Sequence, residues 1–180
     1  CVATRLSDVA DDWRVLEETG HATVFQTRRW IEPLLRIAAP AAAAEPFFVL
    51  VRARASGAPQ MLLPLCRRRR GALREIEFAD LGASDYNAPL IAAGFRPSRA
   101  EFAALWTSIR AVLPAADILR IEKSPATIAG APNPLAQLGF MHRLALAAWR
   151  LPLPETREAY EREILGARFP KRRGVRAGAP

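Results

Sequence analysis

The sequence predicts an α+β fold in which a mixed, mostly antiparallel central sheet is flanked by helices in an α/β three-layer arrangement. Two observations support this prediction. Two amphipathic helical segments precede three consecutive strand-like runs, and helical and strand-like segments then alternate. The 180 residues are enough for one ordinary domain. A hydrophobic content of 51% excludes an intrinsically disordered chain.

The first predicted helix lies near the N-terminus. Apolar side chains recur at helical spacing from Val9 to Leu16. Ser7 or Asp8 is the expected N-cap, and Gly20 is the expected stop.

The next segments predict a second helix and an antiparallel meander. Residues 30–38 form the helix, in which Pro33 must lie in the first turn or produce a kink, because a later proline removes a helical hydrogen bond. The alanine-rich residues 39–45 connect it to three predicted strands at 46–54, 60–66 and 72–79. Pro64 places the second strand near an edge or a bulge. Arg67–Gly71 is the expected turn into the third strand.

Helices and strands alternate in the remainder of the chain. A polar loop at 83–89 leads to the clearest helix, which Ser98 and Glu101 open as a capping box and Pro114 ends. The later expected elements are a strand at 117–122, a short helix from Pro134, a strand at 142–149 and a charged helix at 155–165.

The formal net charge of +8 is concentrated in two short runs. Arg67–Arg70 supply four positive charges, and the tail from Arg168 onward supplies five. The other residues carry 17 basic and 18 acidic side chains, so the body of the chain is close to neutral. The runs support one hypothesis, a non-catalytic module that binds anions or nucleic acid. A solvated hairpin turn explains Arg67–Arg70 equally well, and nucleic acid is disfavoured because neither interleaved aromatics nor a recognition helix is visible.

The cysteines and histidines do not indicate a catalytic or metal-binding site. Cys1 and Cys66 cannot make a disulfide framework and favour a reducing compartment, so a cytoplasmic location is expected. Cys66 beside the arginines could be an activated thiol, but a small residue filling a half-buried strand is the better explanation. His21 and His142 are far apart, with no cysteine at metal-ligand spacing, so no metal site is predicted. No run approaches the ~18 apolar residues of a membrane span.

Asp85 and Tyr86 form the most informative polar pair, because they stand in a loop between two apolar runs. A carboxylate beside a phenol at this place could line a substrate cleft. An Asx-type turn with a tyrosine packed on the sheet explains the same residues, and the local sequence favours the turn.

Several short motifs in a fixed order resemble one family. They are Trp13 and Leu16, then Val-Phe-Gln-Thr-Arg-Arg-Trp-Ile at 24–31, Leu-Pro-Leu-Cys-Arg-Arg at 63–68, Ser-Asp-Tyr-Asn-Ala-Pro-Leu at 84–90, and the leucine-proline run 151–155 leading to Tyr160. With these motifs the chain resembles the N-terminal half of the CelD-like proteins. These belong to the GNAT N-acetyltransferase superfamily and are associated with cellulose or exopolysaccharide biosynthesis. The resemblance covers nearly the whole chain.

The resemblance implies two tandem GNAT-like halves, as in the Fem-type aminoacyl transferases, with the acyl-CoA site in the second half. Residues 1–153 would be the GNAT-like N-terminal domain. Residues 154–180 would be a linker helix and basic tail leading to a missing C-terminal GNAT domain. A start without methionine favours a fragment of a longer protein over a lipidated Cys1.

The implied activity is transfer of an acyl group from acetyl-CoA or another acyl-CoA to an amine-bearing small molecule, a sugar or an envelope precursor. This half would contribute to the acceptor cleft, with Asp85, Tyr86, Trp30 and Arg67 as candidate substrate-binding residues, and would be inactive alone. The superfamily's phosphate loop, Gln or Arg-x-x-Gly-x-Gly or Ala, holds pyrophosphate on backbone amides between a strand and a helix. Residues 90–98, in the equivalent place, contain one glycine and depart from this pattern. No catalytic or cofactor-binding residue is therefore assigned.

Overall fold

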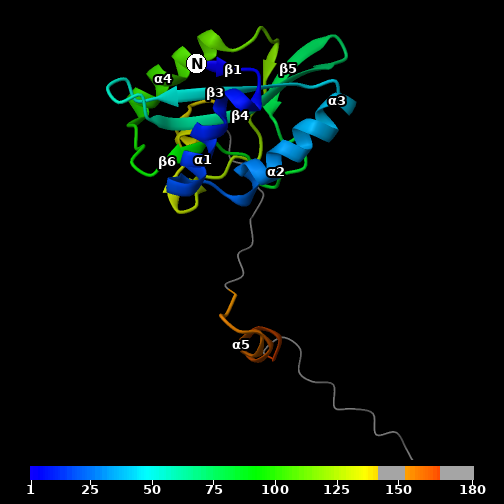
Figure 1. The fold of residues 1–180 in the computed structure, drawn as a ribbon, viewed down its shortest axis with the longest axis vertical. Helices are drawn as coiled ribbons and strands as arrows, with labels where there is room; N and C mark the ends of the chain where they lie inside the picture. The colour runs from blue at the N-terminus through cyan, green and yellow to red at the C-terminus, as the bar shows by residue number, and fades with distance from the viewer. Residues whose placement is uncertain (142–152, 167–180) are drawn as a thin grey trace, which may run out of the picture. The chain divides into compact units, whose positions relative to one another are not determined.

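The structure, a computed structural model, describes residues 1–141 and 153–166. The chain divides into two compact units, Cys1–Met141 and His142–Pro180. The described part of the first unit holds a seven-stranded sheet whose strands pair antiparallel except at one place (Figure 1). Helices together with this mixed sheet confirm the predicted α+β class. The predicted strand at 142–149 and the basic tail from Arg168 lie outside the described residues.

The first helix forms where predicted, but its cap differs. The elements are β1 (Val2–Ala3), the 3-10 turn η1 (Leu6–Val9), α1 (Ala10–Thr19) and β2 (Gly20–His21). The expected N-cap at Ser7 or Asp8 is wrong, because both residues lie inside η1 and α1 begins without a side-chain cap. Gly20 does end α1. A Cβ there would lie 2.6 Å from the carbonyl oxygen of Leu16 and still closer to that of Ile91.

The second helical run is longer than expected. After the 3-10 turn η2 (Val24–Gln26) come α2 (Arg28–Pro33), the π-helical η3 (Leu34–Ala38) and α3 (Ala39–Ala41). Pro33 does not lie in the first turn, and the widened π-helical turn starts at the next residue. A proline within a helix removes a backbone hydrogen bond, so a departure from α geometry at this point follows. Helical geometry also includes Ala39–Ala41, which the sequence places in a connection.

The three central strands form the predicted meander, with one wrong turn. They are β3 (Glu45–Arg52), β4 (Pro59–Arg70) and β5 (Leu73–Phe78). The predicted turn at Arg67–Gly71 is wrong, because Arg67 pairs with Ile76 and Arg70 with Leu73 inside the β4–β5 ladder. Only Gly71 and the following alanine make the turn, and Gly71 supplies the positive φ of 62°.

Pro64 lies in a central strand, so the predicted edge or bulge is also wrong. On one side β4 pairs with two different strands in turn. Met61 and Leu62 pair with β6 (Leu90–Ala92), and the residues from Leu65 onward pair with β5. The Pro64 carbonyl accepts a hydrogen bond from the Ala79 N–H at 3.1 Å on this same side. The N–H and C=O of one strand residue point to the same side of the strand. The position where Pro64 lacks an N–H therefore faces the gap between β6 and β5, where neither strand pairs with β4.

A crossover completes the sheet. The helix α4 (Arg99–Val112) carries the predicted capping box of Ser98 and Glu101 and leads to β7 (Ile118–Leu119), which runs parallel to β5. The remaining elements of this unit are β8 (Thr127–Ile128), β9 (Ala131–Pro132) and η4 (Pro134–Gln137), which begins with the predicted proline. The second unit contains α5 (Arg157–Tyr160) and η5 (Glu161–Leu165), where a charged helix is predicted.

Helices cover both faces of the sheet (Figure 1). Alternation along β3 directs Phe47 and Val49 to the face packed by α4, and Phe48 and Leu50 to the face packed by α1 and α2. The buried indole of Trp13 in α1 packs edge-on against Phe48, with ring centroids 5.6 Å apart. In the described residues the core is thus divided into two layers by the sheet.

Candidate functional site

The loop between β5 and β6 is held in place from several directions. Its Asp80 carboxylate accepts a hydrogen bond from the Ser84 N–H at 3.1 Å, and the Ser84 hydroxyl accepts one from the Trp30 indole at 3.1 Å. The Gln26 amide donates to the Tyr86 carbonyl at 2.7 Å. The Lys123 ammonium donates to the Ser84 carbonyl at 2.8 Å. These contacts fix the loop against α2 and against the segment that follows β7.

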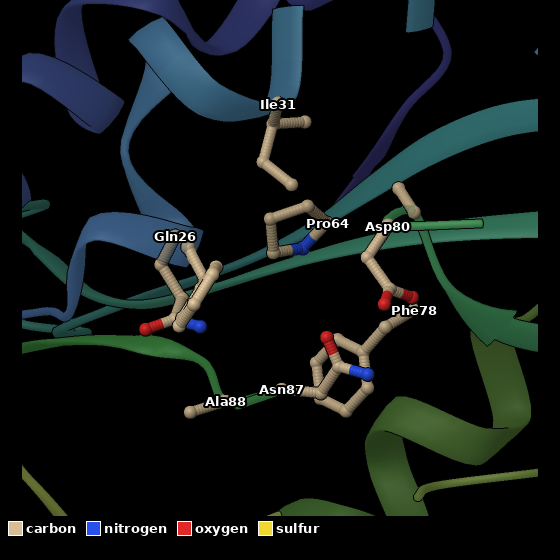
Figure 2. Close-up of a pocket in the computed structure, with 9 residues that line it drawn as sticks. Gln26, Ile31, Pro64, Phe78, Asp80, Asn87 and Ala88 are labelled. Atoms are coloured by element: carbon tan, nitrogen blue, oxygen red, sulfur yellow. The ribbon is translucent and has the colours of Figure 1, made fainter. Parts of the chain in front are cut away.

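Two hollows border this loop. The first, here called the apolar hollow, is a shallow space of about 190 Å³ that includes open solvent, and it lies beside Pro64, where β5 and β6 separate. Phe25, Ile31 and Phe78 supply most of its apolar wall, and Figure 2 shows Ile31 and Pro64 on one side with Ala88 opposite.

The second, here called the charged hollow, is open to solvent, and the space of about 400 Å³ that its lining residues border includes part of that solvent. Its basic side chains are Arg68, Arg70, Arg120 and Lys123, and its acidic ones are Glu77, Asp80 and Glu122. Phe78, Asp80 and Asn87 line both hollows, so the two spaces adjoin the same stretch of chain.

Two carboxylates organise the arginines of the charged hollow. Glu75 is only 1% exposed, and each of its oxygens meets a different guanidinium: Arg70 at 2.5 Å and Arg120 in a second close contact. Glu77 meets Arg68 at 2.6 Å and Arg70 at 3.4 Å. Ions this deeply buried must be paired, and here every carboxylate oxygen faces an arginine.

The Asn87 amide retains contact with solvent, because the fully buried polar atoms without a hydrogen-bond partner in the described residues are Arg68 Nε, Glu75 Oε1, Glu77 Oε1 and Trp106 Nε1. Asn87 is 7% exposed, yet its amide makes no hydrogen bond with the described residues, while its backbone N–H donates to the Lys123 carbonyl at 2.9 Å. Asp80, 5% exposed, uses only Oδ2 in its bond to Ser84. In Figure 2 the Asp80 carboxylate is directed toward the side of the apolar hollow on which the Asn87 amide lies.

Three of the four sequence-predicted site residues lie near one another. The ring of Phe25 packs against both Trp30, at 5.1 Å between centroids, and Tyr86, at 5.9 Å. Asp85 precedes Tyr86 and is exposed. None of the three lines either of the two hollows described above, although Phe25 lines the apolar one.

The structure does not bring Arg67 to the other three. Its guanidinium meets Glu45 at 2.5 Å and donates to the Ala115 carbonyl at 3.3 Å. Leu65, two positions earlier on the same face of β4, belongs to the core layer under α4. Trp30 packs in the opposite layer with α1.

The arginine run is divided between the two faces of β4. Because strand side chains alternate, Arg67 and Arg69 point to one face, and Arg68 and Arg70 to the other. Arg67, Arg68 and Arg70 all pair with carboxylates, and Arg69 alone of the four makes no ion pair with the described residues. The run therefore does not form one continuous basic patch, which weighs against the nucleic-acid hypothesis.

Sequence analysis missed Glu75, Glu77 and Arg120 as members of this region. A usable signal was present for the first two, since Arg68 and Arg70 face Glu75 and Glu77 once the strands turn at Gly71. Arg120 carried no such local signal. It joins the cluster only because β7 pairs with β5.

The prediction for Cys66 has a clear structural counterpart. Cys66 is buried, and this burial is the main cause that raises the pKa of its thiol to about 12, with the nearby Glu77 carboxylate adding to the rise. A thiol held neutral in this way packs as a small apolar residue. Within residues 1–141 and 153–166, no group of three or more potential metal ligands comes together.

The N-terminus of α4 is occupied by the chain's own carboxylate. Glu101 accepts hydrogen bonds from the Ser98 N–H at 2.8 Å and from its hydroxyl at 2.7 Å, which lower the pKa of the Glu101 carboxyl. Helix N-termini bind phosphate through free amides and a favourable dipole. Here the Glu101 carboxylate lies beside that end of the helix, bound to the Ser98 N–H and hydroxyl, and its negative charge disfavours a second anion there.

Comparison of the chain with models of known protein families, with curated proteins and with solved structures gives no match. None of the helices in the described residues is long and apolar enough to cross a membrane.

Proposed function

We propose that this chain is the N-terminal part of an acyl-CoA-dependent N-acyltransferase of the GNAT superfamily, similar to the CelD-like proteins, and that its first unit forms part of the acceptor cleft. The acceptor is an amine carried by a small molecule, a sugar or an envelope precursor. Acetyl-CoA or another acyl-CoA is the donor and binds chiefly to a second GNAT domain that follows this one. The location of the whole protein is cytoplasmic.

One observation carries the proposal. Three segments that bear the family resemblance are far apart in the sequence, and all contribute to the two hollows beside the β5–β6 loop. Residues 24–31 supply Phe25 and Ile31, residues 63–68 supply Pro64, and residues 84–90 supply Asn87. Convergence of the motifs on one place is expected when they serve a common site, because a small-molecule site gathers its residues in a concavity.

The connection of the sheet is compatible with this assignment. The chain leaves β5, passes through the β5–β6 loop, the short strand β6 and the helix α4, and returns in β7, which is parallel to β5. Ligands of such units bind beyond the carboxyl ends of the strands, where the β5–β6 loop lies. Glu101 at the N-terminus of α4 supports placing the pyrophosphate of the donor elsewhere.

In this proposal Asp85, Tyr86 and Trp30 form one wall of the acceptor cleft, and Arg67 is not part of it. Trp30 and Tyr86 contact Phe25, which faces the apolar hollow. Asp85 and Tyr86 line neither hollow, so in this proposal they contact the part of the acceptor that projects beyond Phe25. Tyr86→Phe and Asp85→Asn test this contact, and loss of a hydrogen bond to a charged part of the acceptor should raise its KM about tenfold. Arg67→Gln serves as the control and should leave that KM unchanged.

The activity itself is tested with two proteins: this chain alone, and the chain extended by the coding sequence that follows residue 180. Acyl transfer to a panel of amines is followed by the appearance of free CoA thiol. Turnover by the extended protein and none by the chain alone is the expected result. Turnover by the chain alone would overturn the placement of the donor site, and failure of the extended protein to bind acyl-CoA would overturn the proposed class.

A further inference from the structure

The charged hollow combines both signs of charge in one small space. Four basic groups surround it, and four acidic groups balance them once the buried Glu75 is counted with Glu77, Asp80 and Glu122. A hollow with balanced charges matches a small molecule that itself carries both a positive and a negative group, because each group then meets its opposite. A uniform polyanion is not matched by it.

The positive part of the hollow is held in position before any ligand arrives. Glu75 pairs with Arg70 through one oxygen and with Arg120 through the other, so one buried carboxylate positions two guanidinium groups. Each guanidinium has five N–H donors, and these contacts use only part of them. Both side chains remain almost half exposed, at 49% and 40%, and can offer the other donors to a carboxylate or phosphate.

The lining of the charged hollow also includes acceptors that the described residues do not use. Asn87 is nine-tenths buried with an unpartnered amide, and Asp80 has an oxygen free of hydrogen bonds among the described residues. The Asn87 amide atoms still reach solvent, so water satisfies them until a ligand takes its place. An ammonium group, with three donors, can be bound by the Asp80 carboxylate and the Asn87 carbonyl together.

We infer that the charged hollow binds an amine that also carries an oxyanion group, with the oxyanion between Arg70 and Arg120 and the amine at Asp80 and Asn87. This inference rests on the proposed function, because it names the class of acceptor: a zwitterionic amine, bearing either a carboxylate or a phosphate. Asp80 and Asn87 orient the amine, and Arg70 and Arg120 provide the anchor.

Binding of three probes without any acyl-CoA tests the inference. Glucosamine 6-phosphate carries both groups, glucosamine lacks the phosphate, and glucose 6-phosphate lacks the amine. Titration calorimetry on the 180-residue chain should show glucosamine 6-phosphate binding at least about tenfold more tightly than either of the others, since each charge-assisted contact contributes at least that factor. Equal affinities, or no binding of any probe, would overturn the inference.

Variants assign the two ends of the ligand. Arg120→Gln should weaken glucosamine 6-phosphate about tenfold and leave glucosamine unchanged. Asn87→Leu should weaken both amine-bearing probes and leave glucose 6-phosphate unchanged. Arg69→Gln is the matched control, because it removes the same charge from the opposite face of β4 and should leave all three affinities within about twofold.

A folding defect in Arg120→Gln is covered by a second substitution. Arg120→Lys keeps the charge next to Glu75 but loses the planar fork, so phosphate affinity should fall while circular dichroism stays native. Asn87→Leu tests the proposed amine position without removing any member of the ion cluster. Unchanged affinity for the amine-bearing probes in a folded variant would show that the amine does not bind at Asn87.

The outcomes separate this inference from the proposed function. Selective binding of glucosamine 6-phosphate, with no acyl transfer by the extended protein, would retain the site and reject the enzyme class. Acyl transfer to amines that do not compete with glucosamine 6-phosphate would retain the class and reject the site.

Discussion

The carboxylate of Glu75 meets the guanidinium of Arg70 at 2.5 Å, although only 1% of Glu75 is exposed to solvent. Arg120 meets the other oxygen of the same carboxylate, so the buried charge is enclosed between two cations. The partners differ in burial, because the arginines still reach water and Glu75 does not. Removing the arginines should therefore lower the free energy of unfolding by a different amount than removing the carboxylate.

The double variant Arg70→Leu/Arg120→Leu leaves Glu75 as a buried charge without a partner. We expect it to lower the free energy of unfolding by about 3 kcal/mol or more, whereas Glu75→Leu should cost less because the freed arginines can be hydrated. Urea unfolding measures both. Adding Glu75→Leu to the double variant should restore part of the loss, and a triple variant less stable than the double one would contradict this account.

Gly20→Ala should be destabilising through backbone contact. The new methyl group would meet the carbonyl oxygens of Leu16 and Ile91, which are fixed by α1 and by the β2–β6 pair. Overpacking of this kind costs about 1–3 kcal/mol, which thermal unfolding can measure. Gly94→Ala is the matched control, since its Cβ would meet open space at an ordinary φ. Similar melting temperatures for the two variants would contradict the crowding at Gly20.

The two cysteines should differ sharply in reactivity. Burial holds the pKa of the Cys66 thiol at about 12, while Cys1 is exposed. A thiol reagent at pH 8 should therefore label one cysteine in the folded chain and two in denaturant. Cys1→Ser provides the control and should show no fast labelling when folded. Rapid modification of Cys66 in that variant would disprove its burial.

The capping box of α4 should make the free energy of unfolding depend on pH. Hydrogen bonds from Ser98 hold the pKa of Glu101 below its ordinary value, so the folded state favours the ionised carboxylate. This contribution is present above the ordinary pKa and is lost as the pH falls through the lowered one. Glu101→Gln should thus be less stable than the wild type at neutral pH and equal to it in strong acid. An identical difference at both pH values in urea unfolding would contradict this.

Much of the fold could be predicted because its signals are local. The meander needs only alternating apolar runs separated by Gly57 and Gly71, and α4 begins at a capping box encoded within four residues. The predicted strand at 117–122 appears as the shorter β7, but the two-residue strands β1 and β2 could not be predicted in the same way. They exist only because distant partners pair with them, as Val2 pairs with Val49.

The candidate site shows the same division between local and distant information. Trp30 and Tyr86 could be chosen from their motifs, but their common neighbour Phe25 became evident only in three dimensions. The low hydrophobicity of the four arginines suggested a solvated turn. They lie in strand β4 instead, where pairing across to Glu75 and Glu77 on β5 stabilises the strand.

The parallel pairing of β5 with β7 also sets an order of assembly for the ion cluster. The β4–β5 hairpin can bring Arg70 to Glu75 early, since its contacts are close in sequence. Arg120 can arrive only after α4 has been made and β7 has docked. We therefore expect the carboxylate of Glu75 to stay hydrated until β7 docks and supplies its second cation. Dehydration of Glu75 thus marks the completion of the sheet.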